Sequence, residues 1–139
     1  MKDFVTYEIA VKLKEKGFDE LCLLHYTNEQ ILVQNSTQST IGDTIGVDDI
    51  LDSYNRFNNA CTDVPTISQV LKWFREEKIY HVEIIANASG YIYVVSDIPS
   101  KGGTDRFFSN YRGTNDGGAW DKWEDCAIDA IEYVLNNLI

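Results

Sequence analysis

The strongest structural signal in the chain is the stretch Pro65-Thr66-Ile67-Ser68-Gln69-Val70-Leu71-Lys72-Trp73-Phe74. Its apolar residues recur at the i, i+3, i+4, i+7 spacing of one helix face, and Thr66 with Gln69 fits the capping box that opens many helices. We therefore expect a helix over residues 66–78. Trp73 falls at the edge of the buried face of this helix, where packing under a loop and contact with another subunit are both open.

A β-hairpin is expected on each side of this helix. Apolar runs at 21–26 and 31–34 enclose a polar loop of four residues, and β-rich runs at 81–86 and 91–96 enclose a turn that contains Gly90. The first of these runs is apolar on both faces, which is typical of a central strand. Antiparallel pairing is therefore expected in both places.

Two further helices are expected near the ends of the chain. Residues 4–16 carry apolar residues at helical spacing and lysines towards the end, followed by Gly17 as the cap. From Asp121 almost to Ile139, one side of a 3.6-residue period is apolar. Strands grouped in hairpins predict an α+β fold. We expect a single domain over residues 1–139, with an antiparallel sheet built from two hairpins and packed with three helices.

Two stretches interrupt this pattern, and we interpret both as variable insertions that carry partner specificity. Residues 35–64 are rich in Ser, Thr and Asn, and a short helix is expected through 47–57 because a structureless loop of this length is unusual. Residues 97–118 are rich in Gly, with a brief strand expected at 106–109.

Composition disfavours several classes of protein. The 139 residues carry a net charge of −10, which disfavours binding to nucleic acid because phosphate affinity comes largely from clustered cations. No apolar run is long enough to cross a bilayer, and no signal-peptide pattern opens the sequence, so we expect a cytoplasmic protein without a membrane partner. The three cysteines form no CxxC pair, which favours reduced, mostly buried thiols over a metal site.

Catalytic motifs are absent from the sequence: there is no GxSxG elbow, Walker lysine, GxGxxG after a strand, or HExxH. His25 and His81 each fall in an expected strand, which is more typical of a structural histidine than of a catalytic one. We therefore expect a protein that is not an enzyme, with no catalytic residues, no metal and no cofactor.

One candidate binding surface is an acidic stripe on the C-terminal helix. Four acids follow the i, i+4, i+8, i+11 spacing of one exposed face: Asp121, Asp125, Asp129 and Glu132. Like charges at this spacing cost a few tenths of a kcal/mol each, so the stripe does not serve helix stability. It suits docking on a basic protein partner, and an ordinary solvated helix face is the alternative.

The second candidate is the Gly-rich loop before that helix, where aromatic and cationic residues alternate. Such residues are able to stack on a base or another planar ligand. They are Arg106, Phe107, Phe108, Tyr111, Arg112 and Trp120. The alternative is that the aromatic residues pin the loop to the domain.

Two stretches, residues 1–20 and 65–78, resemble a group of small, uncharacterised phage and prophage proteins of gut bacteria, and the end of the chain also matches. That group pairs an N-terminal helix with a PTISQVLKW-like helix and an EAIEYVLNNLI-like C-terminal helix. Leu21 departs from the group's pattern, in which proline is common at this position. The group has no established activity, so the resemblance implies that the chain is a member of the group but indicates no reaction, ligand or catalytic residue.

From these observations we expect a phage or prophage accessory protein that acts through protein–protein contacts. Its partner is expected to be a host protein or a second copy of the chain, and a homodimer is possible. Two alternatives stay open: a small-molecule or nucleotide-binding protein that uses the aromatic loop, and a structural homo-oligomer.

Overall fold

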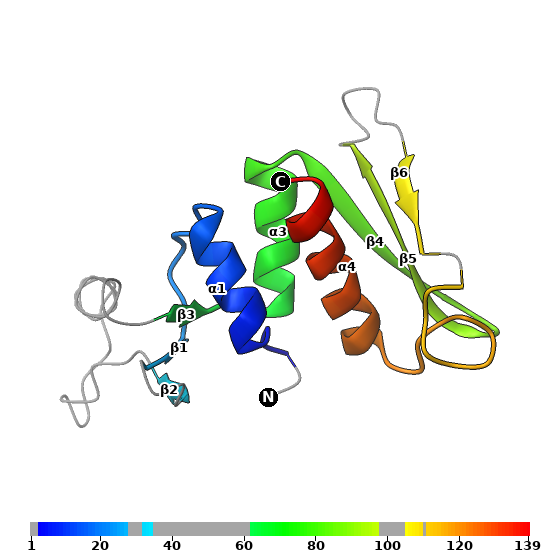
Figure 1. Cartoon of the computed structure of the whole chain (residues 1–139), viewed down its shortest axis with the longest axis horizontal. Coiled ribbons are helices and arrows are strands. Elements are labelled where there is room, and N and C mark those ends of the chain that lie inside the picture. Colours follow the sequence, from blue (N-terminus) through cyan, green and yellow to red (C-terminus); the bar gives the residue numbers. More distant parts are fainter. Residues whose placement is uncertain (1–2, 28–31, 35–61, 98–104, 110) are drawn as a thin grey trace, which may run out of the picture. The chain divides into compact units, whose positions relative to one another are not determined.

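The computed structural model describes most of the chain (Figure 1). The described residues are 3–27, 32–34, 62–97, 105–109 and 111–139. They gather into two compact units, one formed by residues 4–66 and the other by residues 1–3 with 67–139. The helix expected at 47–57 lies outside the described residues.

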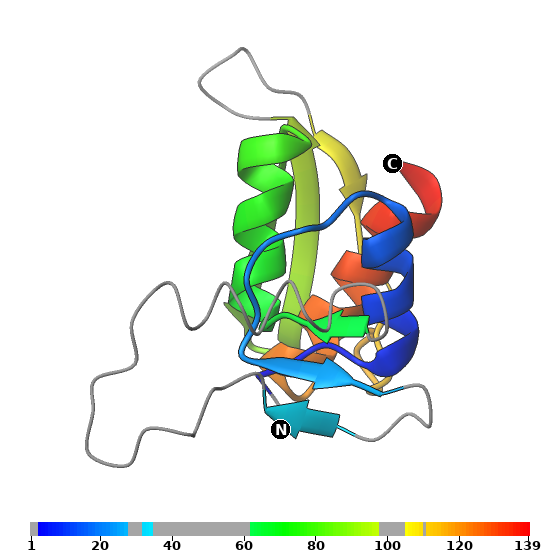
Figure 2. The same cartoon turned by 90° about the vertical axis from the view of Figure 1, so that its left-hand side faces the viewer.

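The unit of residues 4–66 contains a three-stranded antiparallel sheet and one helix (Figure 2). Its strands are β1 (Leu24–Tyr26), β2 (Leu32–Gln34) and β3 (Thr62–Val64). Their order is β2-β1-β3, so β1 is central, as its apolar faces predicted. The expected hairpin is confirmed, but β3 lies in a stretch that we interpreted as an insertion.

The helix of this unit, α1 (Tyr7–Glu15), begins later than residue 4 because Thr6 caps it. The Oγ1 atom of Thr6 accepts a hydrogen bond from the N–H of Ile9 at 3.3 Å, which satisfies one of the unpaired donors at the helix start. Phe4, which we had placed in the helix, forms a β-bridge with Thr66 instead. The helix packs against β3.

In the other unit, two helices cover one face of a second three-stranded antiparallel sheet (Figures 1 and 2). Its elements are α3 (Ile67–Glu77), β4 (Tyr80–Asn87), β5 (Gly90–Asp97), β6 (Asp105–Phe108) and α4 (Trp123–Asn137). The strand order is β4-β5-β6, with α3 against β4 and α4 against β5. The expected helices, hairpin and brief strand of this region are confirmed to within two residues at each end.

The α+β class with antiparallel pairing is therefore confirmed, with one difference in how the strands are grouped. The two hairpins belong to two separate sheets, because each acquires its own third strand. Those strands, β3 and β6, both come from the stretches interpreted as insertions. Whether the chain is one domain stays a prediction.

Alternation along β5 and β6 decides which aromatic side chains are covered by the helices. Tyr93 and Val95 of β5 are fully buried. Phe107 pairs with Val95 and so shares its covered face, whereas Phe108 pairs with Val94 and lies on the opposite face. Half of Phe108 is therefore exposed.

Trp73, for which packing and subunit contact were both open, is covered within the chain. Only 3% of it is exposed. Its ring lies 5.8 Å from that of Phe74, and Nζ of Lys78 lies 5.1 Å from its centroid. This burial leaves almost no Trp73 surface for a partner.

Candidate binding surface on the loop of residues 111–121

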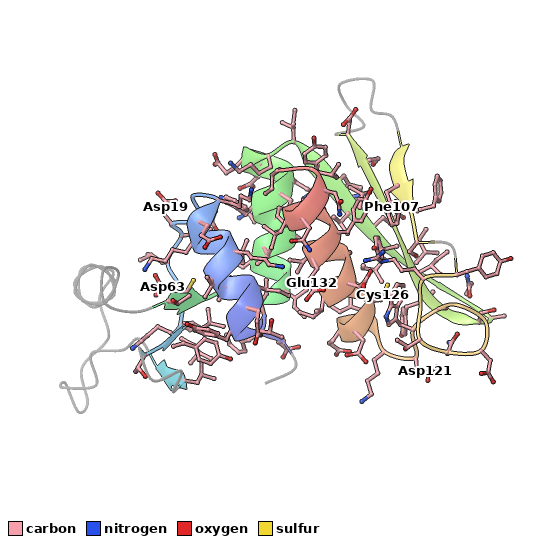
Figure 3. The ribbon with its side chains drawn as sticks, in the orientation of Figure 1. Asp19, Asp63, Phe107, Asp121, Cys126 and Glu132 are labelled. Atoms are coloured by element: carbon pink, nitrogen blue, oxygen red, sulfur yellow. The ribbon has the colours of Figure 1, made fainter. Side chains whose placement is uncertain are left out.

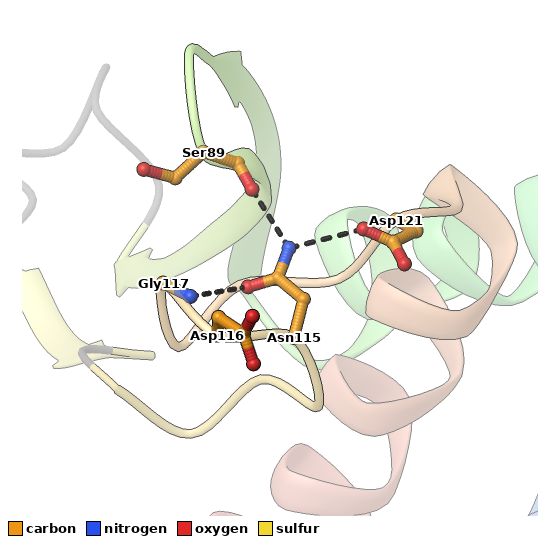
Figure 4. A pocket seen from close by; sticks show the side chains of 5 residues that line it. All are labelled: Ser89, Asn115, Asp116, Gly117 and Asp121. Atoms are coloured by element: carbon orange, nitrogen blue, oxygen red, sulfur yellow. Dashed lines mark hydrogen bonds between the residues drawn. The ribbon is translucent and has the colours of Figure 1, made fainter.

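The loop between β6 and α4 is organised by one side chain, that of Asn115 (Figure 4). Its Oδ1 accepts hydrogen bonds from the N–H groups of Gly117 at 3.0 Å and Ala119 at 2.9 Å. Its Nδ2 donates to the carbonyl of Ser89 at 2.7 Å and to Oδ1 of Asp121 at 3.1 Å. Asn115 thus joins the loop to the β4–β5 turn and to the approach to α4.

The two arms of this loop lie so close together that glycine is required. The N–H of Gly113 donates to the carbonyl of Gly118 at 2.8 Å. A Cβ atom on Gly113 would overlap the backbone of Ala119, and one on Gly118 would meet the backbone of Tyr111. Gly118 also has a φ of +74°, which favours glycine.

This closed loop displays Tyr111. The residue is 89% exposed, and its φ of 58° places it in the left-handed region, which is uncommon for residues other than glycine. Such conformations persist where the surrounding structure enforces them, and they cluster at functional sites. Tyr111 and the half-exposed Phe108 are the two aromatic residues of the predicted surface that face solvent.

An open hollow of about 450 Å³ lies beside Asn115. It is lined by Ser89, Asn115, Asp116, Gly117 and Asp121 (Figure 4). An adjoining hollow of about 270 Å³ is lined in part by Tyr111 and Ile92. Ligand sites for small molecules are typically enclosed and largely apolar. An open, acidic hollow next to a displayed tyrosine is better suited to contact with another macromolecule.

Beneath the loop, the carboxylate of Asp129 on α4 joins the sheet to the loop. Its Oδ2 accepts hydrogen bonds from the Tyr93 hydroxyl at 2.7 Å and from Nε of Arg112 at 2.6 Å. Burial, together with the bond to Asp129, raises the pKa of Tyr93. The bond to Asp129 also raises the pKa of Arg112. The cluster therefore contains a neutral tyrosine and a charged arginine.

Aromatic rings pack around this cluster. The rings of Phe107 and Tyr133 stack with centroids 3.8 Å apart and an interplanar angle of 16°, and the Arg112 guanidinium lies 6.0 Å from each. Trp120 is buried, with its ring 5.7 Å from that of Tyr93. Trp120 thus holds the loop to the sheet and is not open to a ligand, whereas Phe107 is partly buried and has one face of its ring covered by Tyr133.

The four acids of the predicted stripe do not form one exposed row, because Asp129 and Glu132 are partly buried; Asp121 and Glu132 are labelled in Figure 3. Asp121 lies before α4, which begins at Trp123, and is bonded to Asn115. Asp129 is engaged by Tyr93 and Arg112, as described above. Asp125 remains exposed and Glu132 is partly buried. The expectation of a continuous stripe is wrong because the loop folds back onto the helix and neutralises one of its members.

Sequence reasoning missed Asn115 and Tyr93. Asn115 stands two residues before Gly117, a spacing at which an Asn side chain commonly bonds the backbone of a turn, and this signal was available. Tyr93 reads as one more aromatic residue in a strand, and its partner Asp129 is 36 positions away. Among the described residues, no group of three or more His, Cys, Asp or Glu side chains is placed to hold a metal ion.

Cys126 is expected to resist alkylation in the native protein. It is fully buried on α4. Burial is the main cause that raises the pKa of its thiol to about 12, and the nearby Asp129 carboxylate adds to the shift. An ordinary thiol has a pKa of about 8.5 and reacts as the thiolate. At about pH 9, iodoacetamide should therefore label Cys126 at least a hundredfold more slowly in native protein than in urea, as followed by peptide mass spectrometry. Equal rates in the two conditions would contradict the burial of Cys126.

Comparison of the chain with protein-family models, with curated proteins and with solved structures finds no match. The described residues include no helix with the length and apolar character needed to span a membrane.

Proposed function

We propose that this protein is a phage or prophage accessory protein that acts without catalysis, by contacting a protein partner through Tyr111 and the loop that displays it. One observation carries the proposal: a tyrosine that is 89% exposed is held in the left-handed conformation by a closed loop. Tyrosine is enriched at protein interfaces and among the residues that dominate binding energy. A loop already fixed before binding loses little entropy when a partner docks.

The surroundings of Tyr111 favour a partner with a basic patch. Asp116 and Asp121 line the hollow beside the loop, and the chain carries a net charge of −10. Complementary charge speeds the encounter of two proteins and disfavours partners of like charge. The ligand-binding alternative has less support, because Trp120 is buried and Phe107 is partly buried and stacked on Tyr133.

A photo-crosslinking amino acid at position 111 tests this proposal in cells of the bacterial host. We expect one dominant adduct with a host protein, formed through position 111 and weakened by high salt after lysis. The same amino acid at Arg75, an exposed position on α3, serves as the control and should give no such adduct. An identical adduct pattern from both positions, or no adduct from position 111, would count against the Tyr111 surface.

Tyr111→Gly should separate binding from stability. Glycine adopts the left-handed conformation without steric cost, so the free energy of unfolding in urea should rise by about 1 kcal/mol. Loss of the exposed ring should weaken partner binding by about 30-fold or more, the size typical of an interface hot spot. Tyr111→Asn is the matched control, since asparagine also tolerates this conformation. Lower stability in both variants would show that the ring serves the fold.

A further inference from the structure

We propose that the free edge of β4 pairs with β4 of a second copy of this chain, joining two three-stranded sheets into one continuous antiparallel sheet. Among the residues that the structure describes, the strand order is β4-β5-β6, and β4 is an edge strand that pairs only with β5. The interface is distinct from the Tyr111 loop, so the two proposals can fail separately.

The backbone groups on the outer edge of β4 follow from those of β5. The N–H of Tyr93 donates to Oγ of Ser109, and the N–H of Tyr91 donates to the carbonyl of Trp120, so these two residues direct their backbone groups away from β4. The even-numbered residues of β5 therefore direct their backbone groups toward β4, where they form hydrogen bonds with its odd-numbered residues. This leaves four residues of β4 with outward N–H and C=O groups: Tyr80, Val82, Ile84 and Ala86. No hydrogen bond to these groups is present among the described residues.

The two edges of this sheet differ in how they are protected. Strand β6 has four residues, begins with two charged ones, Asp105 and Arg106, and pairs with β5 across a register shift at Val95/Ser96. Short length, charge and bulges are the features that prevent an edge from pairing. Strand β4 has eight residues in unbroken register, no proline or lysine, and one charged residue, Glu83. Strand β4 therefore lacks the features that prevent an edge strand from pairing with another strand.

Charge selects the register of the proposed pair. Two-fold symmetry requires that one residue of β4 lie opposite its own copy. With Glu83 on the axis, two like charges would face each other, which destabilises a strand pair. With Val82 on the axis, each Glu83 lies opposite the partner's His81, and both pairs are at non-hydrogen-bonded positions, where side chains are closest. The structure therefore favours the register centred on Val82.

On the other face of β4, away from His81 and Glu83, the side chains are also compatible with the register centred on Val82. Tyr80 and Ile84 are half-buried in the single chain and share a face with buried Val82. In the register centred on Val82, each Tyr80 lies opposite the partner's Ile84. Aromatic and β-branched residues form favourable cross-strand pairs. Both faces of β4 are thus complementary to a second copy.

Sedimentation velocity over a range of concentrations tests the proposal. We expect a concentration-dependent dimer. Glu83→Lys should raise its Kd about tenfold, because the two Glu83 carboxylates would no longer accept hydrogen bonds from the partner's His81. His81→Glu should do the same by placing Glu opposite Glu83. The double variant His81→Glu/Glu83→Lys places Glu opposite Lys in both pairs and should bring the Kd back to the wild-type value or below it. A protein that stays monomeric at about millimolar concentration, or a double variant as weak as the single ones, would overturn the proposal.

Disulfide cross-linking provides a second measurement that does not depend on affinity. Cysteines at 81 and 83 together should form a covalent dimer on oxidation, because these positions face each other across the axis. The control pair, cysteines at 83 and 85, would face each other only in a register centred on Ile84. Cross-linking of the control pair alone would overturn the proposed register. Tyr111→Gly should leave cross-linking unchanged.

Discussion

Asp129→Ala is expected to lower the free energy of unfolding by about 3 kcal/mol, as measured by urea denaturation. The substitution leaves the hydroxyl of Tyr93 without its acceptor inside the core, and an unsatisfied buried group costs more than its hydrogen bond contributes. It also removes the charge-assisted bond to Arg112, which holds the loop against α4.

Two further variants show whether this loss of stability comes from the contacts of Asp129 with Tyr93 and Arg112 or from a change in the helix itself. Glu132→Ala removes a partly buried acid three positions further along α4, and it should change the free energy of unfolding by no more than about 0.5 kcal/mol. Tyr93→Phe removes the hydroxyl itself, so adding it to Asp129→Ala should recover part of the lost stability. Strictly additive losses in the double variant would show that Tyr93 and Asp129 are not coupled.

The second large effect is expected from Gly113→Ala, with a loss of about 3 kcal/mol. The added Cβ would overlap the backbone of Ala119, and backbone cannot move aside as the end of a flexible side chain does. The arms of the loop must separate, which breaks the bond from Gly113 to Gly118 and displaces Asn115 from its partners.

Gly17→Ala is the matched control for this prediction. A Cβ at Gly17 meets no atom within 4 Å, and the cost there comes only from the φ of +92°. That cost should be about 1 kcal/mol. If the two alanine variants were equally stable, the close approach between Gly113 and Ala119 would not constrain the loop. Gly113→Ala should also abolish the adduct expected from position 111.

Local sequence patterns predicted the helices and hairpins because their causes are local. The Ile67 to Phe74 stripe and the alternation around Gly90 depend on residues a few positions apart, and both elements lie within two residues of the expected bounds. The start of α1 was misplaced because apolar Phe4 and Val5 fit the helix period, whereas the Thr6 cap decides the boundary. The spacing of apolar residues alone does not determine the residue at which a helix begins.

The candidate surface was predicted only in part, because its geometry depends on contacts between distant residues. Tyr111, Arg112 and Phe107 were singled out by composition, but composition does not separate the displayed ring from the packed one. That separation follows from the β5–β6 register, which places Phe107 inward and Phe108 outward. The prediction of a continuous acidic stripe was wrong for the same reason, since nothing near Asp129 in the sequence indicates that Arg112 will form a hydrogen bond with it.

The clamp made by Asn115 also has a consequence for how the protein unfolds. Its bond to Ser89 joins residues 26 positions apart, and the Tyr93–Asp129 bond spans 36, so the loop is ordered only when both the hairpin and α4 are in place. Segments held in this way open together as one cooperative unit. A partner that binds the loop alone therefore stabilises the whole sheet and helix unit against unfolding, by an amount set by its concentration relative to its Kd.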